Sequence, residues 1–272
     1  MVGHDVCAAL ESRDETVLSL TKSDLDITDA PAVRDVIRRA KPDIIVNCAA
    51  YTKVDDAEVN EHLANAINGS AVEFLAEAAN DTGALLVQIS TDFVFDGSKR
   101  APYEVNDVPA PLSAYGRSKL IGEQAASIAR NHIILRTAWL FGVHGPNFVE
   151  AIRNQIRKGT NPLRVVNDQR GRPTYTPHLA DAIVRLAQRA VADETARGIV
   201  HYADEPECTW FDFARAIVGD GATVTPVSSD AFPRPARRPA YSVLSTGRYE
   251  RITGLKPASW EEGLRDYLQR RS

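Results

Sequence analysis

Short apolar runs alternate with longer amphipathic segments along most of the chain. Continuous apolar runs at residues 44–46, 85–89 and 133–135 are typical of strands that are buried on both faces of a parallel sheet. A further β-branched run at residues 16–20 predicts a strand nearer the N-terminus.

The segments between these runs carry apolar residues at helical spacing. Thr28 or Asp29 can cap a helix that ends before Pro42, and two longer helices are predicted over residues 57–80 and 113–130. Strands that alternate with helices indicate βαβ units. We therefore expect an α/β fold with a Rossmann-like, doubly wound parallel sheet.

After about residue 142 the pattern continues but becomes looser, with loops rich in Pro, Gly and Arg. Strands are predicted at residues 163–166 and 199–202, and helices at residues 177–192 and 209–218. We expect a dinucleotide-binding domain over residues 1–142 and a smaller α/β substrate-binding lobe over residues 143–272, which can return elements to the sheet. A ligand cleft between two such lobes is favoured.

Composition narrows the function classes. The 272 residues include 32 Lys+Arg and 36 Asp+Glu, a net charge of −4 that argues against nucleic-acid binding. No apolar run approaches the length of a membrane span and no signal peptide opens the chain, so we expect a cytoplasmic protein without a membrane partner. Three distant cysteines and scattered histidines indicate neither a disulfide framework nor a metal-ligand set.

The strongest chemical signal is the segment YGRSK at residues 115–119. It places Tyr115 and Lys119 four residues apart, on one face of a predicted helix. A nearby ammonium lowers the pKa of a phenol and makes it useful in proton transfer. The lysine can also bind a ribose hydroxyl. Chance produces such pairs too, so the pair needs support from its context.

Polar and small residues follow the predicted strands at their carboxyl ends, where doubly wound sheets bind ligands. Thr91 and Asp92 follow the run at 85–89, and a hydroxyl there can share a substrate carbonyl oxygen with Tyr115. Ala49 and Ala50 follow the run at 44–46 and allow close approach of a cofactor. A capped turn at the first position and close helix packing at the second are the structural alternatives.

Several longer segments carry more specific patterns: DITD at 26–29, AAYTKVD at 49–55, ISTDFVFDG at 89–97, YGRSKL at 115–120, LRTAWLFG at 135–142 and VNDQRGRPT at 166–174. Together they resemble the extended short-chain dehydrogenases/reductases and, among these, the dTDP-4-dehydrorhamnose reductases. The resemblance covers nearly the whole chain from Gly3.

The resemblance implies reduction of the C4 keto group of dTDP-4-dehydro-L-rhamnose by a nicotinamide cofactor. It implies that Tyr115 is the proton donor and that Lys119 lowers its pKa and holds the nicotinamide ribose. Thr91 would hold the carbonyl oxygen, with Asp92 beside the substrate and Trp139 against the deoxyhexose. The positions that would contact the cofactor are Gly3, Asp26, Ile27, Ala49, Ala50, Tyr51, Tyr115 and Lys119.

The chain departs from the family pattern at its start. The family opens with a strand and a GxxGxxG turn that places the pyrophosphate on a helix N-terminus. Here Gly3 aligns with the last of these glycines, and the first strand and the two earlier glycines have no match. We expect that the sequence as written starts inside the family's first βαβ unit and that cofactor binding is weakened accordingly.

Cofactor choice is indicated by the residues after the run at 16–20. Lys22 lies there between two hydroxyl residues, and no acid occurs before Asp24. A lysine suits the 2′-phosphate of NADPH, whereas NAD-specific proteins usually place an acid here. NADPH is therefore favoured, and NADH stays an alternative because the family tolerates both. A solvated loop charge is the alternative interpretation of Lys22.

Other functions stay open. A reductase of another nucleotide-linked 4-keto-6-deoxy sugar is the nearest alternative, and the fold also serves as a non-catalytic regulatory subunit of methionine adenosyltransferase. Some relatives use Mg²⁺ at a homodimer interface, but no ligands for it can be assigned here. The basic cluster Arg234, Arg237 and Arg238 could meet a substrate diphosphate.

Overall fold

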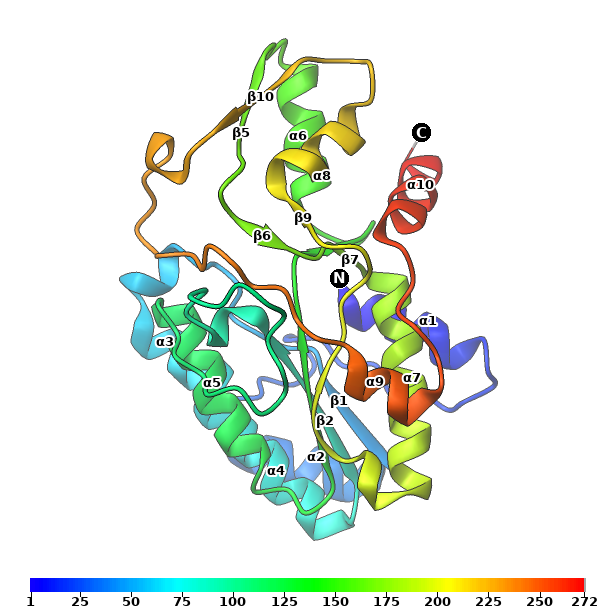
Figure 1. The fold of residues 1–272 in the computed structure, drawn as a ribbon. Coiled ribbons are helices and arrows are strands. Elements are labelled where there is room, and N and C mark those ends of the chain that lie inside the picture. The colour runs from blue at the N-terminus through cyan, green and yellow to red at the C-terminus, as the bar shows by residue number, and fades with distance from the viewer. Residues whose placement is uncertain (272) are drawn as a thin grey trace.

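A parallel sheet forms the centre of the computed structural model, which describes residues 1–271 (Figure 1). Among these residues the sheet has four strands in the order β1-β2-β3-β8. They are β1 (Ile44–Asn47), β2 (Leu85–Thr91), β3 (His132–Thr137) and β8 (Gly198–His201). All neighbours pair in parallel, so their carboxyl ends form one edge of the sheet. The predicted α/β, Rossmann-like parallel sheet is confirmed.

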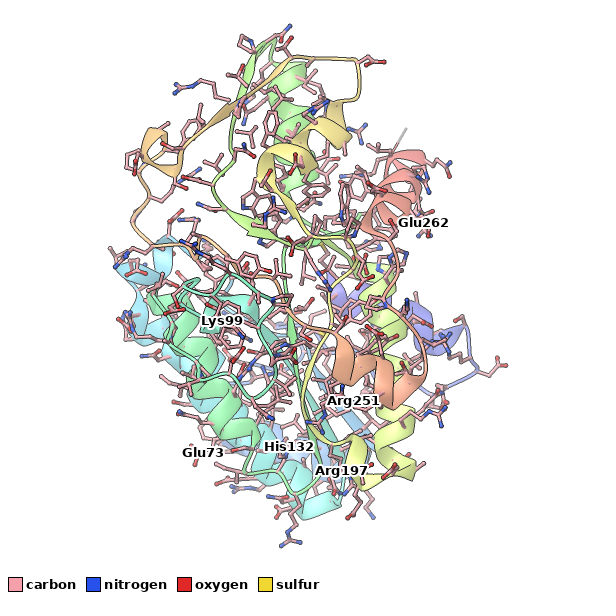
Figure 2. All side chains as sticks on the ribbon, viewed as in Figure 1. Glu73, Lys99, His132, Arg197, Arg251 and Glu262 are labelled. Atoms are coloured by element: carbon pink, nitrogen blue, oxygen red, sulfur yellow. The ribbon has the colours of Figure 1, made fainter. Side chains whose placement is uncertain are left out.

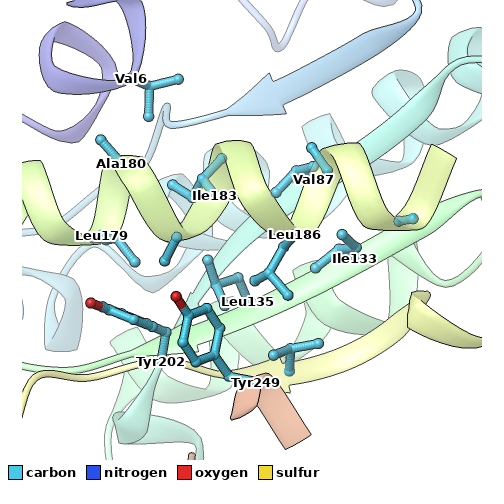
Figure 3. Close-up of a cluster of buried hydrophobic side chains, with 14 of the residues drawn as sticks. Val6, Val87, Ile133, Leu135, Leu179, Ala180, Ile183, Leu186, Tyr202 and Tyr249 are labelled. Carbon is cyan, nitrogen blue, oxygen red and sulfur yellow. The ribbon is translucent and has the colours of Figure 1, made fainter. Parts of the chain in front are cut away.

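Helices cover both faces of this sheet. The helices α2 (Ala30–Ala40), α4 (Ala71–Thr82) and α5 (Ala114–Ala126) share an apolar core with one face, while α1 (Val2–Glu11) and α7 (Thr176–Ala192) share the other core. Figure 3 shows Leu179, Ile183 and Leu186 of α7 directed toward Val87 and Leu135 of the strands. Both faces are thereby removed from water, which explains why the strands have continuous apolar sequences.

A second group of elements lies beyond the carboxyl edge of the sheet (Figure 1). Here β5 (Leu163–Val166) pairs with β10 (Val224–Val227). The helices α6 (Phe148–Arg157), α8 (Trp210–Val218) and α10 (Trp260–Arg270) pack with β5 around an aromatic core. Residues after 142 also return to the main sheet as α7, β8 and α9 (Gly247–Thr253).

The remaining elements are short and connect the larger ones. They are α3 (Glu61–Asn65), β4 (Leu140–Phe141), β6 (Arg170–Gly171), β7 (Thr174–Tyr175), β9 (Cys208–Thr209), the 3₁₀ turns η1 (Asp56–Glu58), η3 (Asp92–Val94), η4 (Glu194–Ala196) and η5 (Ser229–Ala231), and the π turn η2 (Ala66–Ser70). The helix predicted over residues 57–80 is thus a series that runs through η1, α3, η2 and α4. The helix predicted over 113–130 ends at Ala126.

The strand predicted at residues 16–20 is wrong. This segment has no regular backbone pairing, and Leu18 and Leu20 are 62% and 42% exposed. A strand needs a neighbour to receive its backbone hydrogen bonds. Within residues 1–271, β1 pairs only with β2, and residues 16–20 do not pair with its free outer edge. Local β propensity therefore does not become a strand here.

The described part of the chain contains no helix that is both long and apolar enough to cross a membrane.

Helix α5 approaches η2 so closely that only glycine fits at one position. A Cβ built on Gly122 would lie 2.0 Å from the carbonyl oxygen of Asn68. We predict that G122A lowers the free energy of unfolding by about 1–3 kcal/mol, because the two backbones must separate. Urea unfolding followed by circular dichroism measures this. The matched exposed variant Q124A on α5 should change stability by less than about 0.5 kcal/mol. Equal stability of G122A and wild type would contradict the packing argument.

Candidate active site

Polar residues gather where β2 ends at the carboxyl edge of the sheet: Ser90 and Thr91 are its last residues, and Asp92 follows as the first residue of η3. All three are buried. Thr91 begins the η3 turn, where its hydroxyl oxygen accepts a hydrogen bond from the Phe93 amide at 3.2 Å. The same hydroxyl donates to Asp92 Oδ1 at 3.1 Å. The end of β2 is therefore held by its own side chains. Thr91 caps the turn η3, and it is also the hydroxyl residue predicted to contact the substrate.

The first turn of α5 brings Tyr115 to this strand end. Ser113 caps the helix by accepting a hydrogen bond from the Gly116 amide at 3.1 Å. A Cβ on Gly116 would lie 2.3 Å from the carbonyl oxygen of Phe93, so only glycine permits this approach. The Tyr115 hydroxyl is hydrogen-bonded to the Thr91 hydroxyl. The Phe93 ring meets the Tyr115 ring edge-on at 5.7 Å between centroids.

Tyr115 is protonated at neutral pH. Burial raises the pKa of its phenol to about 12, the hydrogen bond with Thr91 lowers it in part, and the charge of Asp92 raises it further. This is opposite to the direction expected from a neighbouring ammonium. The phenol therefore holds its proton until a strong base, such as a forming alkoxide, takes it.

Lys119 lies one turn after Tyr115 and is buried. Its ammonium donates to the carbonyl oxygen of Ile89 in β2 at 2.6 Å. Burial lowers the pKa of Lys119 to about 8, while the negative charge of Glu123 opposes that shift. Lys119 thus stays largely cationic near pH 7 and keeps two N–H groups beyond the one used by the strand.

Asp92 contributes an acceptor that has no protein partner. Its Oδ2 atom is buried without a hydrogen bond. The Oδ1 atom accepts the hydrogen bond from the Thr91 hydroxyl, and the carboxyl group is also hydrogen-bonded to the Ser242 hydroxyl. Burial raises the pKa of Asp92 to about 6. An unpaired buried acceptor is costly, so its presence beside Thr91 and Tyr115 is evidence for a ligand that donates a hydrogen bond there.

Trp139 follows β3 and has a left-handed backbone, with φ of 47°. Its indole stacks on Trp210 with 3.6 Å between ring centroids and 7° between planes. A Cβ on Gly171 would lie 2.5 Å from the Trp139 ring, so that glycine lets the indole sit where it does. This strained residue joins the sheet to the aromatic core of the second lobe. Sequence reasoning missed Trp210, which a capping box at Thr209 places at the start of α8.

The residues after β1 form a turn that is held from both sides. Asn47 binds Gln88 Oε1 through Nδ2 at 2.8 Å, and its Oδ1 accepts from the Ala49 amide at 3.1 Å. The Tyr51 amide donates to Asn68 Oδ1 at 2.8 Å. Asn68 was also missed, although a buried asparagine beside a glycine within a helical pattern is its signal.

Asn68 connects this turn to α5. Its Nδ2 atom donates to the Tyr51 carbonyl at 3.0 Å and to the Ser118 hydroxyl at 2.9 Å. The Tyr51 hydroxyl donates to Asp56 and is not directed at Tyr115. Ala50, the middle residue of the 49–51 turn, is half-buried. The 49–51 turn is therefore rigid and presents backbone and small side chains to its surroundings.

The start of α1 fits an anionic group. No side chain caps this ten-residue helix, so its first amides keep their hydrogen-bonding capacity. A Cβ on Gly3 would lie 3.6 Å from the Cys48 side chain, which places this helix start beside the carboxyl end of β1. The residues present therefore fit one phosphate of a dinucleotide, with the turn at Ala49 adjoining it.

Asp26 and Ile27, expected at the adenine, and Lys22, expected at the 2′-phosphate, lie in the segment that leads into α2. Lys22 is exposed in a turn that Thr21 and Asp24 close, with the Thr21 amide donating to Asp24 Oδ2 at 2.8 Å. The Asp26 carboxylate accepts the amide and hydroxyl of Thr28 at 3.0 and 2.7 Å. Ile27 packs against the core that α2 and α4 share with the sheet. These three residues thus border the α2 face of the sheet.

The basic cluster formed by Arg234, Arg237 and Arg238 contacts Asp55, which lies in the segment between β1 and η1. The Arg238 guanidinium binds both carboxylate oxygens of Asp55, at 3.0 and 2.9 Å, and Arg234 lies 3.7 Å from the same group. These hydrogen bonds lower the pKa of Asp55. Arg237 is exposed. Asp55 thus engages two of the three arginines, and the hypothesis that this cluster meets a substrate diphosphate stays a prediction.

No group of three or more His, Cys, Asp or Glu side chains that could hold a metal occurs within residues 1–271. A cavity of about 480 Å³ lies beside α7 and α9, where Arg251 is labelled in Figure 2. Thr91, Tyr115 and Lys119 are not among the residues that line it. Converging buried polar groups, and not cavity size, therefore mark the candidate active site.

Comparison with known proteins agrees with this geometry. The whole chain, residues 1–272, matches the family described as RmlD substrate binding domain. It is 40% identical to the dTDP-4-dehydrorhamnose reductase of Streptomyces griseus, covering 97% of this chain and 88% of that protein. It is 41% identical to the dTDP-4-keto-6-deoxy-D-glucose reductase of Streptomyces niveus, covering 94% and 89%.

A solved structure supports the same assignment. The dTDP-4-dehydrorhamnose reductase of Bacillus anthracis, crystallised in complex with NADP, superimposes with a TM-score of 0.92 at 36% identity. The match covers 99% of this chain and 95% of that one. The Rossmann-like sheet, the grouping of Thr91, Tyr115 and Lys119, and these similarities together show that the chain belongs to the dTDP-4-dehydrorhamnose reductase family of oxidoreductases.

Proposed function

We propose that this chain reduces the C4 keto group of dTDP-4-dehydro-L-rhamnose to give dTDP-L-rhamnose. The observation that carries the proposal is the hydrogen-bonded hydroxyl pair of the buried Thr91 and the partly buried Tyr115, beside Asp92 with its unpaired carboxylate oxygen. The names of the relatives from Streptomyces griseus and Bacillus anthracis support the substrate class. The name of the Streptomyces niveus relative favours a second candidate, another dTDP-linked 4-keto-6-deoxy sugar.

The two hydroxyls provide the chemistry of carbonyl polarisation. A reduced nicotinamide, when bound, supplies the hydride that reaches C4. Tyr115 can donate to the carbonyl oxygen, which becomes an alkoxide as C4 is reduced, and Thr91 can donate to it as well once its single proton turns away from Asp92 Oδ1. Tyr115 then gives its proton to that oxygen, because an alkoxide is a far stronger base than a phenolate. The raised pKa of Tyr115 ensures that the proton is present before each turnover.

Lys119 supports both steps. Its charge lies one helical turn from Tyr115 and stabilises the phenolate that remains after proton transfer. The N–H groups that Ile89 leaves free suit the ribose hydroxyls of the cofactor. A non-catalytic regulatory function would not need a buried lysine beside a hydrogen-bonded hydroxyl pair, so this geometry favours the enzyme.

The sugar would lie between the two lobes. Asp92 Oδ2 is the acceptor for a sugar hydroxyl, and Trp139 supplies an apolar surface at the lobe junction. In this proposal residues 1–142 hold the dinucleotide and residues 143–272 mainly hold the nucleotide sugar. Gly3 and the 49–51 turn would meet the dinucleotide, with Asp26 and Ile27 near its adenine. We infer NADPH as the cofactor, since Lys22 suits a 2′-phosphate.

Substitution of Tyr115 tests the proton donor. We predict that Y115F lowers kcat by about 100-fold or more, because the second hydroxyl donor and the transferable proton are lost. The dissociation constant for NADPH should change little. Steady-state assays that follow nicotinamide oxidation with the keto-sugar nucleotide measure the first quantity, and fluorescence titration measures the second. Turnover of Y115F at the wild-type rate would exclude the assigned role.

The raised pKa of Asp92 predicts a pH-dependent stability. Because its folded pKa of about 6 exceeds the unfolded value of 3.8, its contribution is present below about pH 4 and is lost as the pH rises through 6. D92N should therefore gain stability relative to wild type, by about 2–3 kcal/mol between pH 4 and pH 8. Urea unfolding of both proteins across this range gives the difference. A difference that does not vary with pH would show that Asp92 is not titrating in a buried site.

Cofactor preference is tested at Lys22. We predict that K22A lowers the NADPH/NADH preference about 10-fold, since a charge-assisted contact with the 2′-phosphate is worth roughly 1.5–3 kcal/mol. Affinities for both cofactors are measured by titration calorimetry. The neighbouring exposed variant K41A, at the end of α2, serves as a control for loss of one positive charge. An unchanged preference in K22A would identify Lys22 as a solvated loop charge.

A further inference from the structure

A buried ion pair lies directly beneath the candidate active site. Glu123 of α5 and Arg136 of β3 expose only 4% and 2% of their side chains. The Arg136 guanidinium donates to both carboxylate oxygens of Glu123, at 2.8 and 2.7 Å. Burial of two charges is costly even when they are paired, so such a pair is weak evidence for stability and needs another explanation.

The pair is the centre of a network that joins four parts of the fold. Ser90 of β2 donates its hydroxyl proton to Glu123 Oε1 at 2.5 Å. His201 of β8 has its Nε2 atom 3.3 Å from Arg136, and the guanidinium lies 5.0 Å from the Phe95 ring centroid. Burial and the charge of Arg136 lower the pKa of His201 to about 3, so the imidazole is neutral. The network is thus fully connected across the sheet.

This network adjoins the catalytic group on two sides. Ser90 immediately precedes Thr91, and Glu123 lies one helical turn after Lys119 on the same helix. Lys119 itself binds the carbonyl of Ile89. Ile89 and Ser90, which directly precede Thr91 in β2, are therefore held to α5 by two side chains of that helix, Lys119 and Glu123. Movement of either contact would change the distance between Thr91 and Tyr115.

We propose that Glu123 is a positioning residue for the reduction, and that its carboxylate, shared by Ser90 and Arg136, holds the end of β2 against α5 so that Thr91, Tyr115 and Lys119 converge. The inference rests on the proposed function of these three residues. Glu123 does not touch them through a hydrogen bond and acts on their geometry and on the charge of Lys119.

The effect on Lys119 makes the role distinguishable from simple structural support. Two titratable groups face its ammonium: Glu123 from α5 and Cys48 from the segment after β1. Glu123 carries the charge that keeps Lys119 cationic against burial, and Arg136 with its neutral neighbour His201 lies on the far side of Glu123. Loss of the Glu123 charge should let Lys119 lose its proton at lower pH.

The test is E123Q, which keeps the side-chain shape and removes the charge. We expect a folded protein whose kcat is about 10-fold lower and whose alkaline limb of the pH–rate profile moves about one pH unit lower. The titration midpoint of Lys119, followed by NMR with ¹³C-lysine, should fall below the wild-type value. E61Q is the matched control. Glu61 of α3 forms an ion pair with Arg117, which lies on α5 as Glu123 does, and both side chains of this pair are exposed. E61Q should leave rate, profile and midpoint unchanged.

A folded E123Q with wild-type rate and an unchanged Lys119 midpoint would overturn the proposal. If E123Q does not fold, S90A tests whether Glu123 positions the end of β2. This variant removes the hydrogen bond from Ser90 to Glu123 and keeps the ion pair with Arg136. We expect kcat to fall several-fold in S90A, and wild-type turnover there would equally overturn the proposal. Wild-type protein that does not turn over the keto-sugar nucleotide would instead count against the proposed function, whereas the Lys119 midpoint in E123Q is read without substrate.

Discussion

The site depends on how closely α5 approaches its neighbours. At Gly116 the helix meets the carbonyl oxygen of Phe93, and at Gly122 it meets that of Asn68, at distances where no Cβ fits. These contacts lie on either side of Lys119 and set the depth at which α5 lies on the sheet. A helix displaced outward by one methyl group would separate the Tyr115 hydroxyl from Thr91. The close backbone packing of α5 therefore sets the distance between the Thr91 and Tyr115 hydroxyls.

Close packing also removes water, and this explains the charges beneath the site. Once α5 lies against β2 and β3, any polar side chain between them must find a partner within the protein. Ser90, Glu123 and Arg136 satisfy one another, with His201 completing the set. Asp92 differs from this network because one of its oxygens has no partner. The contrast between the satisfied network and this unsatisfied acceptor distinguishes the supporting structure from the place where we infer that a ligand binds.

The sequence predicts well what depends on local signals. Asp29 and Ser113 cap helices as their residue types suggest, and the continuous apolar runs become buried parallel strands. The strand predicted at residues 16–20 is wrong although their β propensity is favourable, because they pair with no strand of the described chain. Asn68 and Trp210 could not be placed from periodicity, since their roles arise from contacts between segments that are far apart in sequence.

The pKa of Tyr115 also depends on contacts between distant segments that local sequence patterns do not predict. The spacing of Tyr115 and Lys119 on one helix correctly indicates that both belong to one site, and it suggests that the ammonium lowers the phenol's pKa. The direction of the shift is instead set by burial, which no local spacing encodes, and Lys119 donates to the carbonyl of Ile89. A phenol that keeps its proton at neutral pH is prepared to protonate an alkoxide, whereas abstraction of a proton from an alcohol would need the phenolate. The desolvated hydroxyl pair therefore favours the reductive direction of the proposed reaction, and Lys119 becomes important after the proton has left.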